Sequence, residues 1–109
     1  MFEYDIDKVE VFEAMLQDGY LLIEFYAGWC GTCRSVTRML QHLDTKNVIN
    51  IARIDIDRHP HLVDQYQVLG VPLIVLTYRR AEIKRFGGSI NYQEFKEWIS
   101  TVEAFKELS

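Results

Sequence analysis

The N-terminal third of the chain has a hydrophobic pattern that predicts a helix followed by a buried strand. Between residues 7 and 18, apolar side chains recur at helical spacing, namely Val9, Phe12, Met15 and Leu16. Gly19 follows, where helices often end in a left-handed residue. The next segment, residues 21–27, is apolar on both alternating faces except at Glu24, a pattern typical of a strand buried in the middle of a parallel sheet.

A second helix is predicted directly after this strand. Residues 28–33 read Gly-Trp-Cys-Gly-Thr-Cys, and apolar residues then follow at the i, i+3, i+4, i+7 spacing of an amphipathic helix, namely Val36, Met39, Leu40 and Leu43. The two cysteines therefore lie where the strand passes into the helix.

The remaining pattern predicts a strand, a short helix and a hairpin. Residues 48–56 form a β-branched run, and Pro60 suits the first turn of a short helix that carries Leu62, Val63 and Tyr66. Gly70-Val71-Pro72 precedes an apolar strand over residues 73–78. A short polar turn leads into residues 83–86, as in an antiparallel hairpin, and Gly87-Gly88 ends it.

A capped amphipathic helix is predicted to close the chain. Asn91 and Glu94 have the spacing of a capping box, and an apolar face follows, formed by Phe95, Trp98, Ile99, Val102 and Phe105. The element order is helix, βαβ, helix, ββα. Since βαβ crossovers are right-handed and join parallel strands, we expect an α/β fold with a mixed sheet and helices on both faces.

Length and charge restrict the function. A chain of 109 residues fits one domain, residues 1–109, with a single packed core. Twelve basic and sixteen acidic residues give a net charge of −4 without a basic patch, which argues against nucleic acid as a partner. The acidic N-terminus does not resemble a signal peptide and no apolar run nears eighteen residues, so we expect a cytoplasmic protein that does not bind membranes.

The cysteine pair is the strongest chemical signal. Two cysteines three residues apart cannot form the disulfide framework of a secreted domain, which leaves a catalytic or metal-binding role. A helix N-terminus stabilises a thiolate and lowers thiol pKa values. Cys33 lies on the apolar stripe of the helix and is expected to be buried, whereas Cys30 is expected to be exposed. An exposed nucleophile, Cys30, and a sheltered resolving thiol, Cys33, are what disulfide exchange requires.

Resolution also requires a group that accepts a proton from the buried thiol. Glu24 is the one acid in the buried strand, and burial would raise its pKa toward that of a proton acceptor. Two alternatives remain open: Glu24 at a solvated strand edge, and a zinc site that uses the cysteines with His42, His59 or His61. Trp29 is either a packing residue or an apolar surface beside the reactive thiol.

These residues resemble the thioredoxin family. The resemblance rests on Trp29-Cys30-Gly31-Thr32-Cys33 after an apolar strand and on Gly70-Val71-Pro72 before another, and it covers nearly the whole chain. It implies a thioredoxin fold, Cys30 as nucleophile, Cys33 as resolving thiol and a cis peptide bond before Pro72. It also implies that the Val71 backbone pairs with an extended substrate chain. Three further residues would line the apolar substrate surface, namely Trp29, Gly87 and Gly88.

Several positions depart from the family pattern. Glu24 stands where a buried aspartate is usual, and Arg53 where a lysine often neighbours it. Thr32 replaces a proline between the cysteines, which removes a rigid φ constraint and is expected to alter the relative stability of dithiol and disulfide. Leu73 replaces a threonine, and Arg38 replaces a proline that normally kinks the helix. The family's first strand is expected to be reduced to residues 2–5 or absent.

The resemblance implies a protein-disulfide reductase that works through a mixed disulfide. Its expected partners are protein disulfides and an NADPH-dependent thioredoxin reductase, and the chain itself is expected to be a monomer without a cofactor or a metal. A more oxidising exchanger with a dedicated partner is an alternative, because potentials in this superfamily span roughly −270 to −120 mV. A binding module that has kept only the scaffold is a second alternative, which the retention of both cysteines disfavours.

Overall fold

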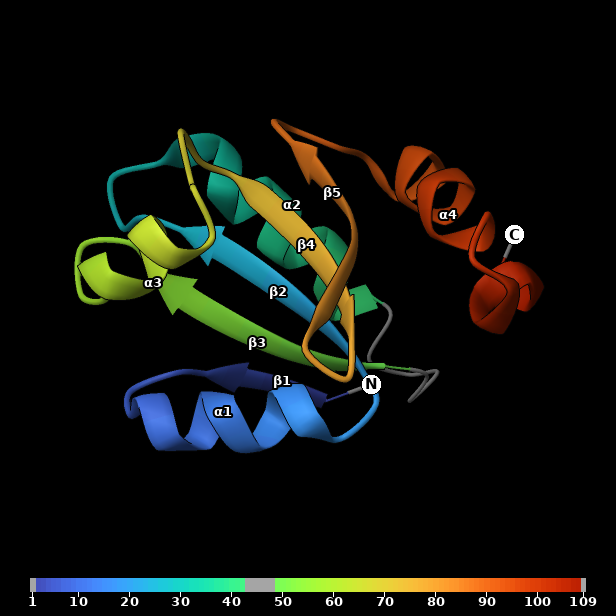
Figure 1. Cartoon of the computed structure of the whole chain (residues 1–109). Helices are drawn as coiled ribbons and strands as arrows, with labels where there is room; N and C mark the ends of the chain where they lie inside the picture. The colour runs from blue at the N-terminus through green and yellow to red at the C-terminus, as the bar shows by residue number, and fades with distance from the viewer. Residues whose placement is uncertain (1, 43–48, 109) are drawn as a thin grey trace.

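The computed structural model describes residues 2–42 and 49–108, and it forms a five-stranded sheet with strand order β1-β3-β2-β4-β5 (Figure 1). The strands are β1 (Phe2–Asp5), β2 (Tyr20–Tyr26), β3 (Asn50–Asp55), β4 (Leu73–Tyr78) and β5 (Ala81–Gly87). β3 pairs in parallel with β1 and with β2, whereas β4 pairs antiparallel with β2 and with β5. The predicted mixed sheet is confirmed. β2, however, has one parallel and one antiparallel neighbour and does not lie within a purely parallel sheet.

The helices follow the predicted order. They are α1 (Val9–Gln17), α2 (Gly31–Gln41), α3 (Pro60–Gln65) and α4 (Tyr92–Ser100), and a 3₁₀ helix, η2 (Glu103–Leu108), follows α4. None of the helices formed by residues 2–42 and 49–108 is long and apolar enough to cross a bilayer. The predicted helix position Leu43 and the predicted strand position Val48 lie outside the described residues.

The closing helix is shorter than predicted. The apolar spacing suggested one helix as far as Phe105, but α4 ends at Ser100 and Phe105 belongs to η2. The Trp98 carbonyl accepts hydrogen bonds from Lys84 Nζ at 2.7 Å and from Thr101 Oγ1 at 3.0 Å. Side chains thus donate hydrogen bonds to a carbonyl group at the end of the helix, as is usual where a helix stops. The predicted capping box of Asn91 and Glu94 is present at the other end of α4.

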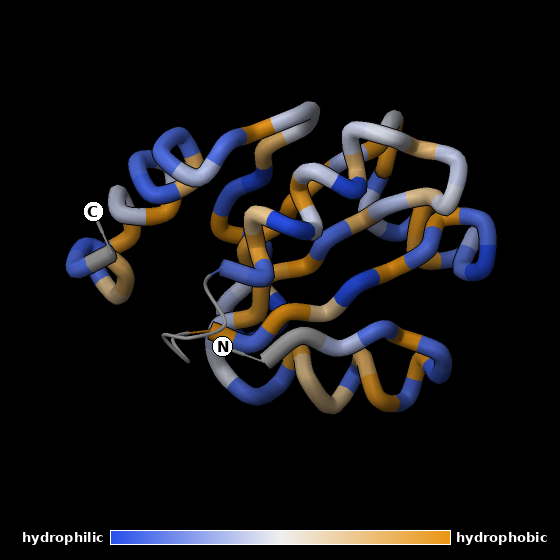
Figure 2. Tube along the Cα trace, turned by 180° about the vertical axis from the view of Figure 1, so that it is seen from behind, coloured by the Kyte–Doolittle hydropathy of each residue, from blue (hydrophilic) through white to orange (hydrophobic). Residues whose placement is uncertain are grey.

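Two apolar cores lie on opposite faces of the sheet. Side chains of α2 and α4 pack with Leu22 on one face, whereas side chains of α1 and α3 pack with Ile23 on the other. Figure 2 shows hydrophobic positions along the strands in the middle of the molecule. Because side chains alternate along a strand, Glu24 lies on the same face as Leu22 and therefore faces α2.

Strand pairing brings two distant loops together at one end of the sheet. The antiparallel register places Phe25 opposite Leu73, so the end of β2 meets the start of β4. The segment that contains Cys30 consequently lies beside the Val71-Pro72 peptide bond, which is cis as predicted. The first strand is present over Phe2–Asp5, which agrees with the shortened strand that we expected.

Candidate dithiol site

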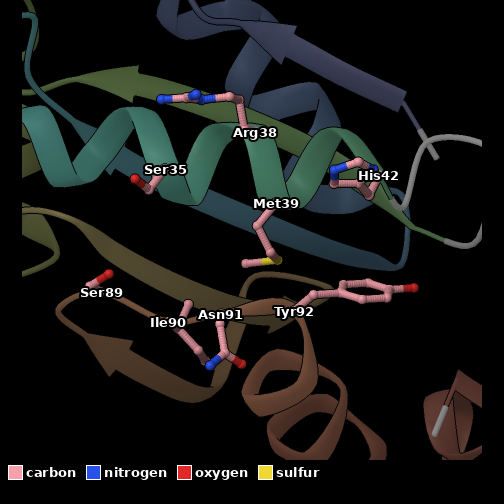
Figure 3. A pocket seen from close by; sticks show the side chains of 8 residues that line it. All are labelled: Ser35, Arg38, Met39, His42, Ser89, Ile90, Asn91 and Tyr92. Carbon is pink, nitrogen blue, oxygen red and sulfur yellow. The ribbon is translucent and has the colours of Figure 1, made fainter.

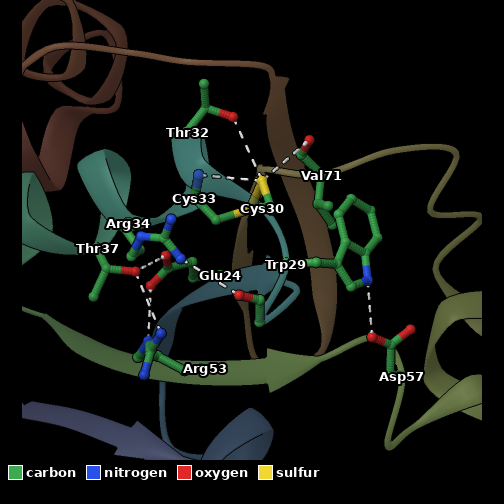
Figure 4. The surroundings of a disulfide bond; sticks show 11 residues. Glu24, Trp29, Cys30, Thr32, Cys33, Arg34, Thr37, Arg53, Asp57 and Val71 are labelled. Atoms are coloured by element: carbon green, nitrogen blue, oxygen red, sulfur yellow. Dashed lines mark hydrogen bonds and ion pairs between the residues drawn. A yellow bond between two sulfur atoms is a disulfide. The ribbon is translucent and has the colours of Figure 1, made fainter.

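The two cysteines lie at the N-terminus of α2 and are joined by a disulfide, as Figure 4 shows. Cys30 is the N-cap residue of the helix, and its Sγ accepts a hydrogen bond from the Cys33 backbone N–H at 3.2 Å. Backbone N–H groups at a helix start stabilise negative charge on a sulfur atom. The position predicted for the dithiol is therefore confirmed, and it suits a reactive thiolate at Cys30.

The expected exposure of Cys30 is wrong. Cys30 is 7% exposed and Cys33 is 2% exposed, so both residues are buried. Cys30 forms a small apolar cluster with Ala27 and Cys33, and Tyr26, Ile56 and Val71 pack against this cluster. Its Sγ lies 3.9 Å from the Val71 carbonyl oxygen, because the cis Val71-Pro72 loop covers the start of α2. Only a small part of Cys30 is therefore accessible to a substrate sulfur.

Thr32 places a hydroxyl group beside the reactive sulfur. Its Oγ1 lies 3.4 Å from Cys30 Sγ. In the reduced protein a Cys30 thiolate carries no proton, so the hydroxyl is the donor and the sulfur the acceptor. The family that the sequence resembles usually has a proline at this position, and proline has no such donor. Thr32 therefore adds a hydrogen bond to the stabilisation that the helix N-terminus gives the thiolate.

Glu24 is fully buried, with 0% exposure, so the alternative of a solvated strand edge is wrong. Arg53 Nε donates to Glu24 Oε1 at 3.2 Å, and the Thr37 hydroxyl donates to Glu24 Oε2 at 2.5 Å (Figure 4). Arg53 is the residue directly opposite Glu24 in the pairing of β2 with β3. A guanidinium at this distance stabilises the ionised carboxylate and opposes the effect of burial.

Arg53 also interacts with residues at the edge of the buried pair. Its Nη1 donates to Asp5 Oδ1 at 2.7 Å, and Asp5 is the residue opposite Arg53 in the pairing of β1 with β3. Its guanidinium carbon lies 4.1 Å from the centre of the Tyr26 ring. Burial raises the pKa of the Tyr26 hydroxyl, and the Arg53 charge opposes that rise. The short first strand thus supplies a carboxylate that helps to hold Arg53 over the site.

Two exposed apolar side chains and a groove lie close in sequence to Cys30 and Val71. Trp29 is 69% exposed, which excludes a packing role for most of its ring, and its Nε1 donates to Asp57 Oδ2 at 3.0 Å. Leu69 is 99% exposed. A groove of about 410 Å³ begins near Leu69 and continues along Pro72 and Leu73 to Gly87 and Gly88. The structure thus places Val71, Pro72, Gly87 and Gly88 beside one groove.

A second hollow, of about 380 Å³, lies between α2 and the segment before α4. Figure 3 shows Met39 pointing toward Ile90 and Tyr92, whereas Arg38 extends away from them. None of the residues predicted for the dithiol and substrate site lines this hollow, although His42, a candidate in the zinc alternative, does. It is separate from the groove beside Pro72, with which it shares no lining residue.

Three residues near the dithiol were not predicted as functional: Thr37, Asp57 and Leu69. Thr37 is a polar residue four positions after Cys33, and Leu69 is an apolar residue outside every periodic segment. The positions of Thr37 and Leu69 in the sequence could therefore have marked them as candidates. Asp57 gives no comparable signal, because its contact with Trp29 depends on how the loop after β3 folds.

The comparison with protein-family models matches residues 4–101 to the thioredoxin model. The chain belongs to the thioredoxin family. Thioredoxin from Chlamydia caviae is 34% identical over 82 residues, which cover 74% of this chain and 80% of that protein. A solved thioredoxin variant from Halobacterium salinarum superposes with a TM-score of 0.83 at 25% identity, covering 92% of this chain and 89% of that one.

Mitochondrial thioredoxin 3 from Saccharomyces cerevisiae also shares the fold, with a TM-score of 0.78 at 22% identity over 91% of this chain and 94% of that one. Family membership and the Cys30–Cys33 disulfide make the chain a thiol-disulfide oxidoreductase. Across residues 2–42 and 49–108, no three or more His, Cys, Asp or Glu side chains are grouped so that they could hold a metal ion.

Proposed function

We propose that this thioredoxin-family chain reduces protein disulfides through its Cys30/Cys33 dithiol. The observation that carries the proposal is the pair itself: Cys30 caps α2, forms a disulfide with Cys33 and lies beside the carbonyl of Val71, a residue that lines an apolar groove. This geometry combines a stabilised thiolate, a nearby second sulfur and a surface for a polypeptide.

The proposed reaction has two steps. The Cys30 thiolate attacks one sulfur of the substrate disulfide, the substrate S–S bond breaks, and the departing substrate thiolate takes a proton from water. Cys33 then loses its proton to Glu24 and attacks Cys30 Sγ. The bond between Cys30 and the second substrate sulfur breaks, and that sulfur also leaves as a thiolate. The substrate gains two electrons, and the chain retains the Cys30–Cys33 disulfide.

The substrate chain is proposed to bind in an extended form beside Val71, whose backbone would pair with it as a strand pairs with a sheet edge. The groove along Pro72, Gly87 and Gly88 would receive the substrate side chains, and the exposed ring of Trp29 would add to the apolar surface. Leu69 extends this apolar surface. Because Leu73 lines the groove where the family often has threonine, apolar side chains are favoured near the substrate cysteine.

An NADPH-dependent thioredoxin reductase is the proposed source of electrons. A relative from Mycobacterium leprae, a bifunctional thioredoxin reductase/thioredoxin, is 30% identical over 71 residues, which are 63% of this chain and 16% of that protein. The pairing of the two activities in that relative supports the proposal. The reaction as proposed takes place in the cytoplasm, in a monomeric one-domain chain that binds no cofactor.

A more oxidising exchanger is the second candidate, and Thr32 favours it. A hydroxyl 3.4 Å from Cys30 Sγ stabilises the thiolate and hence the reduced form. In this superfamily, stabilisation of the reduced form makes the disulfide a stronger oxidant. The two candidates differ in reduction potential and have the same chemistry.

Redox titration in defined thiol buffers separates these functions. Trp29 fluorescence follows the disulfide, and thiol alkylation confirms it. A midpoint near or below the cytosolic glutathione potential, roughly −220 to −320 mV by method, supports the reductase. A clearly higher midpoint supports the oxidising exchanger. If Cys30→Ser retains the biological activity, both redox functions fail and a binding role replaces them.

A further inference from the structure

Thr37 joins the buried acid to the helix that carries the dithiol. Residues at i and i+4 lie on the same face of a helix, so Cys33 lies on the face of α2 from which Thr37 bonds to Glu24 on β2. The Thr37 hydroxyl donates to Glu24 Oε2 at 2.5 Å and accepts from Arg53 Nη2 at 3.3 Å. Figure 4 shows the three side chains converging below the start of α2.

The two oxygens of Glu24 are held from two different elements. Arg53 on β3 bonds to Oε1, and Thr37 on α2 bonds to Oε2. Arg53 alone would fix the carboxylate with respect to the sheet. The Thr37 bond also fixes it with respect to α2, the element that positions both sulfur atoms.

The chemistry of the three groups assigns a different role to each. A guanidinium does not lose its proton in proteins, so Arg53 does not take part in proton transfer. Glu24 is the group in this cluster that can gain a proton. A threonine hydroxyl both donates and accepts, so Thr37 can bond to Glu24 in its ionised form and in its protonated form.

We propose that Thr37 is a positioning residue that holds the Glu24 carboxylate where it can accept the proton of Cys33. This inference rests on the proposed function. In the resolving step the proton of the Cys33 thiol moves to Glu24, and the new thiolate forms a bond to Cys30 Sγ. The bond from Cys30 to the substrate sulfur breaks, and the substrate leaves with the electron pair and takes a proton from water.

The test uses the reduced full chain and 5,5′-dithiobis(2-nitrobenzoate), an aromatic disulfide that releases one coloured thiolate at each of the two steps. Stopped-flow absorbance gives a first phase for attack by Cys30 and a second phase for resolution by Cys33. The variants are Thr37→Val, which keeps the shape and removes the hydroxyl, and Thr37→Ser, which keeps the hydroxyl. Ser35→Ala removes an exposed hydroxyl on the same helix as a matched control.

Thr37→Val is expected to slow the second phase roughly tenfold at neutral pH, the effect of losing one hydrogen bond to a charged group. The first phase keeps its rate, and the pH profile of the second phase moves to higher pH. Thr37→Ser restores the rate and the profile, and Ser35→Ala matches the parent chain. If Thr37→Val does not fold, Thr37→Ala takes its place in the comparison.

Three results would overturn the inference. They are a second phase in Thr37→Val with the parent rate and profile, a Thr37→Ser variant as slow as Thr37→Val, and an equal slowing of both phases. Failure of the proposed function is distinguishable from these, because the parent chain itself would then show no second phase, with the mixed disulfide at Cys30 left unresolved.

Discussion

Arg53 lies directly opposite Glu24 across the β2–β3 pair, with its Nε 3.2 Å from the buried carboxylate. Glu24 is fully buried and the Arg53 side chain is largely buried, so neither charge has full access to water. A buried charge without its partner is costly, because the protein interior does not replace the lost hydration. The ion pair therefore offsets part of the cost of keeping the carboxylate in the core.

The first prediction concerns this pair. Arg53→Met leaves the Glu24 carboxylate without its guanidinium and is expected to lower the free energy of unfolding by about 3–5 kcal/mol. Urea denaturation at neutral pH measures the change. Arg58→Met is the control, since Arg58 pairs with Asp7 where both side chains are exposed, and it is expected to cost about 0–1 kcal/mol. If both variants lose the same free energy of unfolding, the buried Glu24–Arg53 pair contributes no more to stability than an exposed pair.

The second prediction concerns the hydroxyl beside Cys30. Thr32→Val removes the donor 3.4 Å from Cys30 Sγ, which raises the pKa of the Cys30 thiol and destabilises the reduced form. A hydrogen bond worth about 1 kcal/mol corresponds to a midpoint that is about 20 mV more negative. Redox titration measures the midpoint, with Ser35→Ala as the control. A midpoint that stays constant or becomes less negative would contradict the role given to Thr32.

The third prediction concerns Leu69. Its side chain contributes nothing to the core, so Leu69→Ser is expected to change the free energy of unfolding by less than about 0.5 kcal/mol. If Leu69 contacts the substrate, the variant raises KM for a protein disulfide severalfold and leaves the rate with a small disulfide unchanged. Ile83→Ser is the matched control, because Ile83 is an exposed apolar residue toward the opposite end of β5 from Gly87. Equal effects of both variants would remove the specific role of Leu69.

Local sequence patterns predicted most of the fold and the position of the dithiol. The apolar run around Glu24 indicated a buried strand, and the helical spacing after Cys33 indicated α2, because each signal depends on neighbours in the chain. The capping box of Asn91 and Glu94 is likewise a local feature. Where neighbouring residues determine the structure, the sequence was sufficient.

The features that the sequence did not predict depend on contacts between distant segments. Cys30 is buried because the Val71-Pro72 loop, 41 residues away, packs over it. The closing helix ends early where Lys84 of β5 bonds to the Trp98 carbonyl. The role of Thr37 depends on the β2–β3 register that places Arg53 opposite Glu24. Periodicity along one segment contains no information about such contacts.

The last prediction concerns the ion pair at the groove wall. Arg85 Nε donates to Glu82 Oε2 at 2.8 Å, and its Nη2 donates to the Tyr66 carbonyl at 2.8 Å. The hydrogen bond from Arg85 holds the pKa of the Glu82 carboxyl below its ordinary value of 4.5, although partial burial opposes this. Protonation of Glu82 therefore weakens the contact that joins β5 to the loop after α3.

The sign of the pH effect follows from the lowered pKa. The folded chain binds the Glu82 proton less tightly than the unfolded chain, so the pair contributes stability above pH 4.5 and loses it as the pH falls through the lowered folded pKa. Since both side chains are partly exposed, the contribution is about 0–1 kcal/mol. Urea denaturation over a series of acidic pH values is expected to show that the free energy of unfolding falls less with pH in Glu82→Gln than in the parent chain. Glu103→Gln, which removes a highly exposed carboxylate paired with Lys106, is the control and follows the parent chain. If Glu82→Gln and the parent chain lose stability in parallel, the pair does not stabilise the groove wall.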